Sequence, residues 1–313
     1  MTVALATIPA LINEVFDPVF AEILQRNTFF LSRMPVAGST AERLKWRVHI
    51  SGNDSAGSYG EQDALGTAGR QDYITAELEW KLNKVLVEVT GLAQAVSEGE
   101  GFVRNLLQNE LTEALPDLQE EINTQLLSDG TGNANKDLTG IYAAIDDGTD
   151  VGTYAGIDRT VQTLWQSYRN DNAGGGNRAL TLALMRDVKR TVEAHPRKGR
   201  VTAIYCGDAL WDAYGALLIG STENKRQYND NIQTLEGGWK SLGFEGVPVI
   251  KVPGYAANRM DFVDERWWTY YILRNFVTEQ LAKTRDVDTF YTKHYSQLRC
   301  KDPHKQGTLL EVQ

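Results

Sequence analysis

The feature that most constrains the fold is one long helical segment, residues 98–129, which lies between a strand pattern and a glycine-rich loop. Its apolar residues recur at steps of three to five, which keeps them on one stripe of a helix. They are Phe102, Leu106, Leu111, Leu115, Leu118, Ile122 and Leu126. Such a helix would be roughly 45 Å long at about 1.5 Å per residue. Few compact domains need a helix of that length. The segment therefore indicates a structural building block rather than an enzyme.

The two ends of this helix carry their own signals. Ser97 and Glu100 form a capping-box start, and Gly130 favours a stop. Pro116 falls inside the segment and removes one helix hydrogen bond, so we expect a bend near Thr112 to Leu115.

Two alternating segments before the helix predict a β-ribbon. Residues 43–50 and residues 73–90 both alternate apolar and polar side chains, and the glycine-rich residues 51–70 join them. A two-stranded hairpin is marginal alone in water. The ribbon must therefore lie on another surface, either of its own chain or of a neighbouring copy. Upstream, residues 8–25 have helical spacing broken by Pro18, which indicates a short amphipathic arm.

The pattern changes to compact α/β from Ile157 onward. We expect helices at 157–170 and 179–194, a buried strand at 201–206, a helix from Ala209 capped by Asp208, and strands at 247–252 and 261–273. Residues 278–313 again alternate as strands, with an interruption at Asp302-Pro303. Strands that begin in the ribbon region and resume at the C-terminus predict one domain that is split by an inserted α/β domain.

The composition excludes several classes of protein. The formal net charge is −9, and no dense basic run occurs, which is the wrong sign for binding nucleic acid phosphates. The mean hydropathy is −0.36, and no apolar run is long enough to span a bilayer. The N-terminus lacks a basic start, so no signal peptide is expected and the chain is predicted to be cytosolic. The two cysteines, Cys206 and Cys300, predict neither a disulfide nor a zinc site.

No motif commits the chain to catalysis or to a cofactor. Residues 129–140 place oxygen-bearing side chains at alternate positions, but Ala134 and Gly140 stand where a calcium loop needs glycine and glutamate. Residues 174–176 are glycines that follow no strand, and no phosphate-loop sequence occurs. The four histidines show no metal-ligand pairing. Cys206 lacks the frame of a nucleophile elbow and is interpreted as a buried thiol. The aromatic group 267–271 is interpreted as core and interface packing.

The order of these parts resembles the major capsid proteins of tailed bacteriophages, which have the Hong Kong 97 fold. The resemblance rests on the succession of five segments rather than on one motif. They are KVLVEVTGLAQAVSEGEGF (84–102), LLSDGTGNANKDLTGIYAAI (126–145) with its Gly140-Ile141 step, VTAIYCGDALWDAYGALL (201–218), LEGGWKSLGFEGVPVIKV (235–252) and TRDVDTFYTKHYSQLRCKDPHKQGTLLEV (284–312).

This resemblance implies an α+β Hong Kong 97-like capsid fold and its domains. The expected parts are an N-terminal arm (1–42), an extended loop (43–92), a peripheral domain (93–156 and 270–313) with its spine helix at 98–129, and an inserted axial α/β domain (157–269). In the family the extended loop lies across a neighbouring subunit. We therefore expect inter-subunit contacts from the aromatic and basic residues of the arm and ribbon. These are Phe16, Phe20, Trp46, Tyr59, Tyr73, Trp80, Lys81 and Lys84.

The function that the resemblance implies is that of a major capsid protein. Copies would form hexamers and pentamers of an icosahedral head. The head would be assembled in the host cytoplasm and would enclose double-stranded DNA without binding it specifically. No cofactor and no membrane are expected. Portal and decoration proteins are expected partners, and so is a separate scaffolding protein, because the arm starts almost at Met1. Covalent crosslinking through Lys81 or Lys84 is not predicted. An encapsulin-type compartment is the alternative of the same fold, and a hydrolase that uses Cys206 is a more distant one.

Overall fold

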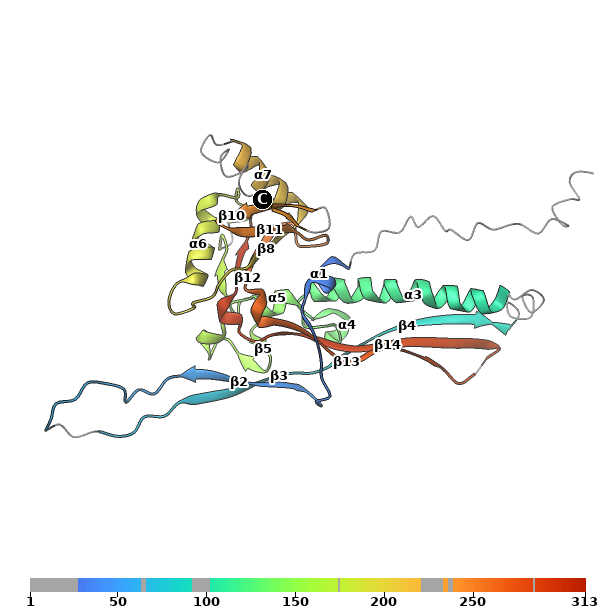
Figure 1. Cartoon of the computed structure of the whole chain (residues 1–313), viewed down its shortest axis with the longest axis horizontal. Helices are drawn as coiled ribbons and strands as arrows, with labels where there is room; N and C mark the ends of the chain where they lie inside the picture. Colours follow the sequence, from blue (N-terminus) through green and yellow to red (C-terminus); the bar gives the residue numbers. More distant parts are fainter. Residues whose placement is uncertain are drawn as a thin grey trace, which may run out of the picture.

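The computed structural model describes residues 28–62, 66–91, 102–173, 175–220, 233–235, 239–283 and 285–313. The arm helix expected at 8–25 and the capping residues Ser97 and Glu100 lie outside these ranges. The ribbon extends from one end of the molecule, and the long helix with a flat sheet extends toward the other (Figure 1). The class is α+β, as expected.

A four-stranded sheet carries the long helix. Its strand order is β1 (Val36–Gly38), β13 (Trp268–Gln280), β14 (Val287–Cys300) and β4 (Lys81–Thr90), with β1 parallel to β13 and the other pairs antiparallel. Helix α3 (Phe102–Leu126) packs on β4, and Leu118, Ile122 and Leu126 are buried. The strands that begin before α3 and resume near the C-terminus therefore do form one sheet.

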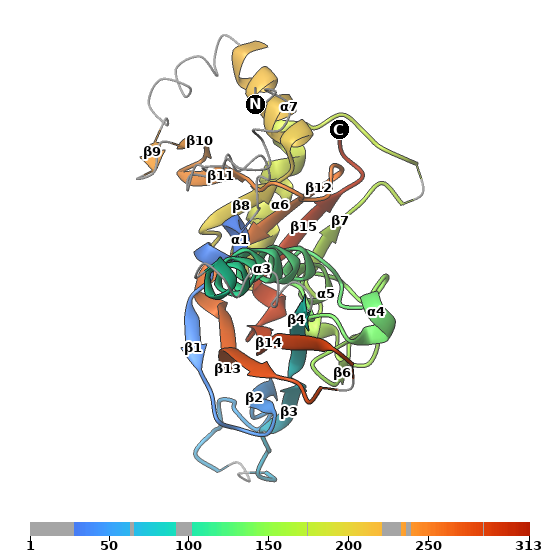
Figure 2. The same ribbon diagram turned by 90° about the vertical axis from the view of Figure 1, so that its right-hand side faces the viewer.

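Helix α3 continues through Pro116 without interruption. Figures 1 and 2 show no break there, so the expected bend is not seen. Proline costs the helix one hydrogen bond. Ala114 and Leu118, which flank it, are buried, and this packing holds the helix on its course. After α3 the chain turns at Gly130, whose φ of +81° fits the predicted stop.

The ribbon consists of β2 (Leu44–Ser51) and β3 (Asp72–Leu78), which pair antiparallel. The strand predicted at 73–90 is wrong as one element, because the chain leaves the ribbon at Leu78 and enters the four-stranded sheet as β4. Side-chain bonds cause the break. The Glu79 carbonyl accepts from the Gln297 amide at 3.0 Å, and the Trp80 indole donates to the Ala41 carbonyl at 2.9 Å. The Glu79 carbonyl is then not available to continue the backbone ladder, and the Trp80 bond holds the chain at this junction.

The second large sheet has seven strands. Its order is β7 (Tyr168–Asn170), β15 (Gly307–Leu310), β12 (Arg259–Val263), β8 (Ala203–Cys206), β11 (Val247–Lys251), β10 (Trp239–Phe244) and β9 (Gln233–Leu235). Helices α6 (Leu182–Glu193) and α7 (Asp208–Gly220) share a hydrophobic cluster with Ile204 and Cys206. Ala203 and Tyr205 belong to the cluster on the other face. Side chains alternate across a strand, so both faces of β8 are covered.

Short elements connect the two sheets. They are α1 (Phe29–Arg33), α4 (Gly132–Asn135), α5 (Ile141–Ala144), β5 (Thr153–Tyr154), β6 (Ile157–Asp158), η2 (Thr163–Trp165), η3 (Glu265–Trp267) and η4 (Pro303–Lys305). Helix α1 is tied to both halves. The Leu31 amide donates to Asn123 of α3 at 3.0 Å, and the Arg33 guanidinium donates to Glu265 at 2.7 Å and to Tyr205 of β8 at 3.0 Å.

The helix predicted at 157–170 is wrong, since this segment forms β6, η2 and β7. Arg159 is fully buried, and its guanidinium donates to the carbonyls of Ala143, Ala144 and Val151 at 2.6–3.0 Å. Asp158 accepts from the Thr160 amide and so closes a turn. These contacts with distant chain override the local helical spacing.

The strand predicted at 261–273 is also wrong as one element. Strand β12 ends at Val263, and the chain crosses to the other sheet through η3 before β13 begins. The buried Asp264 carboxylate fixes this corner by accepting from the Arg200 and Arg266 amides. The tail divides in the same way at Asp302-Pro303. Strand β14 joins the four-stranded sheet, whereas β15 joins the seven-stranded one. Strands β9 and β10 precede β11 in a segment for which the sequence pattern predicts no strand.

The remaining elements of the α/β part follow the sequence patterns. Helix α6 lies within the predicted 179–194, β8 within 201–206 and β11 within 247–252. Helix α7 begins at Asp208 itself.

Candidate assembly surfaces

Of the eight residues predicted as inter-subunit contacts, two lie outside the described ranges and one is buried. Phe16 and Phe20 lie outside the described ranges. Trp46 is only 8% exposed and packs within its own chain, against Trp165 at 6.5 Å between ring centroids. Its indole nitrogen donates to the Lys301 carbonyl at 3.2 Å. Trp46 is therefore part of the core at the base of the ribbon.

Two more of these residues are partly engaged by their own chain. Trp80 is half-buried, and its indole donates to the Ala41 carbonyl. The Lys81 ammonium donates to the carbonyl of Asn135, in the turn after α3. Both residues hold the junction at which the ribbon meets the four-stranded sheet.

The other three predicted contacts are exposed. Tyr59 is 72% exposed in the ribbon tip, and Tyr73 is 58% exposed on β3, where its ring lies 4.9 Å from that of His49. Lys84 is exposed on β4. The ribbon thus presents aromatic side chains that its own chain does not cover.

An apolar surface that the sequence analysis missed lies on the open face of the four-stranded sheet. Leu82 and Leu86 on β4 are 63% and 46% exposed, and they alternate with buried Asn83 and Val87. Cross-strand neighbours point to the same side of a sheet. The half-buried Tyr295 and Tyr291 of β14, which pair with Leu82 and Leu86, extend this surface.

Charges flank the apolar surface. Glu279 of β13 accepts from Tyr291 at 2.5 Å and from Lys293 at 2.6 Å. The hydrogen bond from Lys293 holds the pKa of Glu279 below its ordinary value. Lys84 of β4 and its cross-strand partner Lys293 lie between the two Leu–Tyr pairs on the same face. The face therefore mixes apolar and charged side chains, as protein–protein interfaces commonly do.

The covered face of the same sheet buries an imidazole. His294 is 1% exposed; its ring stacks on Phe276 at 4.4 Å between centroids, and its Nε2 lies 2.9 Å from the Tyr270 hydroxyl. Since that hydroxyl donates to Ser296, it accepts from His294, so the neutral ring carries its hydrogen on Nε2. Burial lowers the pKa of His294 to about 4.

This buried imidazole predicts that acid destabilises the fold. Below the ordinary pKa of 6.5 the unfolded chain binds a proton that the native ring does not, so the free energy of unfolding falls as the pH falls toward 4. Denaturant titrations at pH 6.5 and 4.5 should show a loss about 2 kcal/mol larger in the wild type than in His294→Gln. Equal losses in the two proteins would mean that the native ring takes up the proton.

The described residues offer no catalytic or metal chemistry. Cys206 is buried, its thiol lies 3.7 Å from the Ile250 carbonyl, and burial raises its pKa to about 12. A thiol with that pKa is not a nucleophile at neutral pH. No group of three or more His, Cys, Asp or Glu side chains in the described ranges could hold a metal ion. None of the described helices is both long enough and apolar enough to cross a membrane.

Known structures with this architecture are viral and cellular shells. The capsid subunit of cyanophage A-1(L) superposes with a TM-score of 0.73 at 18% identity, covering 94% of this chain and 95% of that one. The capsid subunit of a native GTA particle has a TM-score of 0.65 at 14% identity over 100% of both chains. The SrpI encapsulin of Synechococcus elongatus PCC 7942 has a TM-score of 0.60 at 13% identity, over 100% of this chain and 96% of that one.

These likenesses define the fold as that of the Hong Kong 97 class of shell proteins. A search of curated protein sequences found no match. The sequence model of the SU10 major capsid protein family matches residues 82–311, so the chain belongs to that family. It is a major capsid protein of the tailed-bacteriophage type, a structural protein of the icosahedral capsid and not an enzyme.

Proposed function

We propose that this capsid protein forms hexamers and pentamers that close into a head around double-stranded DNA, and that each ribbon lies on the open sheet face of a neighbouring copy. The observation that carries this proposal is the uncovered ribbon. Beyond Ile50 and Ile74 nearly every described residue of the ribbon tip is exposed. Strands β2 and β3 pair only with each other among the described strands. An isolated hairpin gains stability by lying on another surface.

The apolar strip around Leu82 and Leu86 suits that ribbon. Burying apolar surface is worth about 25 cal/mol per Å². Tyr59, Tyr73 and Lys84 are the described residues that we propose as contacts between copies, and Phe16 and Phe20 of the arm are proposed on sequence grounds alone. Closed repetition of one such contact produces a symmetric ring.

The proposed domains are the arm (1–42), the extended loop (43–92), the peripheral domain (93–156 and 270–313) and the axial domain (157–269). The two sheets support this division in part, since β14 belongs to one sheet and β8, β11 and β12 to the other, whereas β1 and β4 pair with β13 and β14 although they lie in the arm and loop ranges. Strand β15 pairs with β12 and β7, so we assign Gly307–Leu310 to the axial domain. Membership of the capsid family supports a scaffolding protein, a portal and decoration proteins as partners, and assembly in the host cytoplasm.

The test is assembly of the purified full chain, alone or with its scaffold, followed by electron microscopy. The wild type should form shells. Leu82→Asp/Leu86→Asp should reduce the shell yield at least about tenfold, because it places charge where apolar surface is buried. Leu82→Met/Leu86→Met keeps that surface apolar and should assemble normally. Shells from the Asp variant equal to those of the wild type would refute the docking face.

The encapsulin alternative has its own readout, since the SrpI encapsulin shares the fold. Particles from infected cells should contain nuclease-resistant DNA. Particles that hold protein cargo and no DNA would favour the compartment instead.

A further inference from the structure

A basic patch lies on a chain whose net charge is −9. It comes from three segments: the loop between α6 and β8, the turn η3, and the connection from β14 to β15. We define the basic patch as Lys198, Arg200, Arg266, Lys301 and Lys305. All but Lys305 are exposed, and Lys305 is half-buried.

Short contacts bring the three segments together. The Arg200 amide donates to the Asp264 carboxylate at 3.1 Å, and the Arg266 guanidinium donates to the same carboxylate at 2.6 Å. The Lys301 amide donates to the Trp267 carbonyl at 2.8 Å. The ammonium groups of Lys301 and Lys305 lie 5.6 and 3.9 Å from the centre of the Trp267 ring. These contacts join Arg200, Arg266, Lys301 and Lys305, and Lys198 lies two residues before Arg200 in the same loop.

The positive charges of the basic patch exceed its negative ones. Asp264 has no exposed side-chain surface, and burial works against its ionisation, but the bonds from Arg266 and Arg200 hold its pKa below the ordinary value. Asp302 lies 3.3 Å from Lys305. Across the described ranges, no carboxylate lies within salt-bridge distance of Lys198, Arg200 or Lys301. These three exposed charges are available to an acidic partner.

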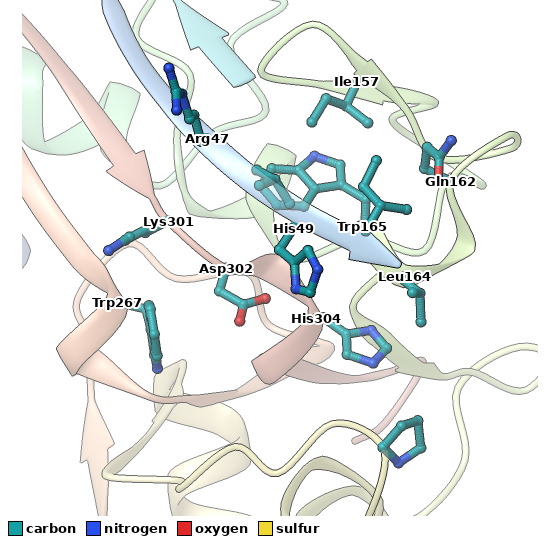
Figure 3. Close-up of a pocket in the computed structure, with 13 residues that line it drawn as sticks. Arg47, His49, Ile157, Gln162, Leu164, Trp165, Trp267, Lys301, Asp302 and His304 are labelled. Carbon is teal, nitrogen blue, oxygen red and sulfur yellow. The ribbon is translucent and has the colours of Figure 1, made fainter. Parts of the chain in front are cut away.

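A cavity of about 510 Å³ brings Lys301 of the basic patch near the base of the ribbon. Arg47 and His49 of β2 line the cavity, and so do Trp267, Lys301 and His304 (Figure 3). A copy that covers this cavity would therefore meet both the ribbon and Lys301.

Helix α3 carries the complementary charge. Glu110, Glu113, Asp117 and Glu121 are exposed and follow one another at steps of three and four, which places them on one stripe. At about 100° per residue, the acidic stripe lies to one side of the face that buries Leu118 and Ile122, and the buried Ala114 lies between the two. No lysine or arginine occurs between residues 105 and 135. Among the described side chains from Glu110 to Glu121, the exposed ones are all acidic.

We propose that the basic patch of one copy binds the acidic stripe on α3 of the next copy around the capsomer, a contact that rests on the ring assembly proposed above. A cyclic ring of identical copies joins two different surfaces of each subunit. The ribbon lies toward one end of the molecule, and α3 extends toward the other (Figure 1). Opposite charges on two such surfaces set the register of neighbours and repel wrong pairings.

A crosslinking experiment tests the contact directly. Lys198→Cys combined with Glu113→Cys, in assembled wild-type-like shells under mild oxidation, should give a ladder of covalent oligomers on non-reducing gels. Both native cysteines are buried, so the background should be low. Arg190→Cys with Glu113→Cys is the matched control, because Arg190 is also an exposed basic residue and lies on α6, outside the basic patch. No ladder from the first pair, or an equal ladder from the control, would overturn the proposal.

A charge exchange tests the energetics. Lys198→Glu/Arg200→Glu should reduce the shell yield at least about tenfold at low salt, because like charges then face each other. Glu110→Lys/Glu113→Lys/Asp117→Lys/Glu121→Lys should do the same. The chain that carries both sets restores the pairing and should assemble. Each variant is first checked for a native unfolding transition. A combined variant that folds and fails to assemble would overturn the proposal, as would a basic-patch variant that assembles normally but packages less DNA. Wild-type protein that forms no shells would instead refute the ring assembly itself.

Discussion

Replacing Arg159 with alanine should lower the free energy of unfolding by about 3–5 kcal/mol, the cost of removing one partner from a buried charged network. Arg159 has no exposed side-chain surface and lies 3.9 Å from the buried Asp146. Its guanidinium donates to the carbonyls of Ala143, Ala144 and Val151. Removing it leaves three carbonyls and a carboxylate without that donor in a region closed to water.

Chemical denaturation of the unassembled chain is the measurement, because assembly would add its own stabilisation. Arg159→Lys should recover only a minor part of the loss, since one ammonium cannot reproduce the planar fork of guanidinium donors. Arg43→Ala is the control. The Arg43 side chain is 41% exposed and pairs with Glu77 and Glu79. Its loss should lower the free energy of unfolding by less than about 1 kcal/mol. Equal effects of Arg159→Ala and Arg43→Ala would show that the buried network does not stabilise the fold.

Arg159 also shows why one helix prediction failed. The apolar spacing of residues 157–170 is compatible with a helix, and nothing in that window shows that carbonyls from residues 143–151 bind the arginine. Periodicity reports local preference, whereas this segment is shaped by partners elsewhere in the chain. The same limit applies at Asp264, whose hydrogen bonds turn the chain from one sheet into the other.

The ribbon and the long helix could be predicted because their signals are local and extended. Alternation over β2 and β3 and a stripe over α3 each repeat many times, so single exceptions such as Pro116 do not hide them. The resemblance to phage capsid proteins added the order of the parts. The family match and the structural relatives confirm the Hong Kong 97 fold class.

Surface assignment was less accurate than fold assignment. Alternation places Trp46 and Trp80 on one face of a strand but does not say what covers that face. Trp46 is covered by Trp165 and Lys301 of its own chain, and both are more than 100 residues away from it in the sequence. Leu82 and Leu86 could have been found, because they occupy the alternate positions of β4 beside Asn83 and Val87.

Replacing Trp46 with alanine should cost about 3–5 kcal/mol of unfolding free energy, as for other buried tryptophans. The change opens a cavity beside Trp165 and leaves the Lys301 carbonyl without the indole donor. It also removes the ring on which the Arg299 guanidinium lies, 5.6 Å from its centre. Denaturant unfolding of the unassembled chain measures this loss.

Tyr73→Ala is the matched comparison, an aromatic residue on the same ribbon that is 58% exposed. It should change the unfolding free energy by less than about 0.5 kcal/mol, as surface substitutions usually do. If the ribbon lies on a neighbouring copy, the same substitution should reduce the shell yield, because the tyrosine is then buried between copies. The two substitutions therefore distinguish an effect on folding from an effect on assembly. A Tyr73 variant with normal stability and normal shells would remove this residue from the interface, and a Trp46 variant with wild-type stability would place its ring outside the core.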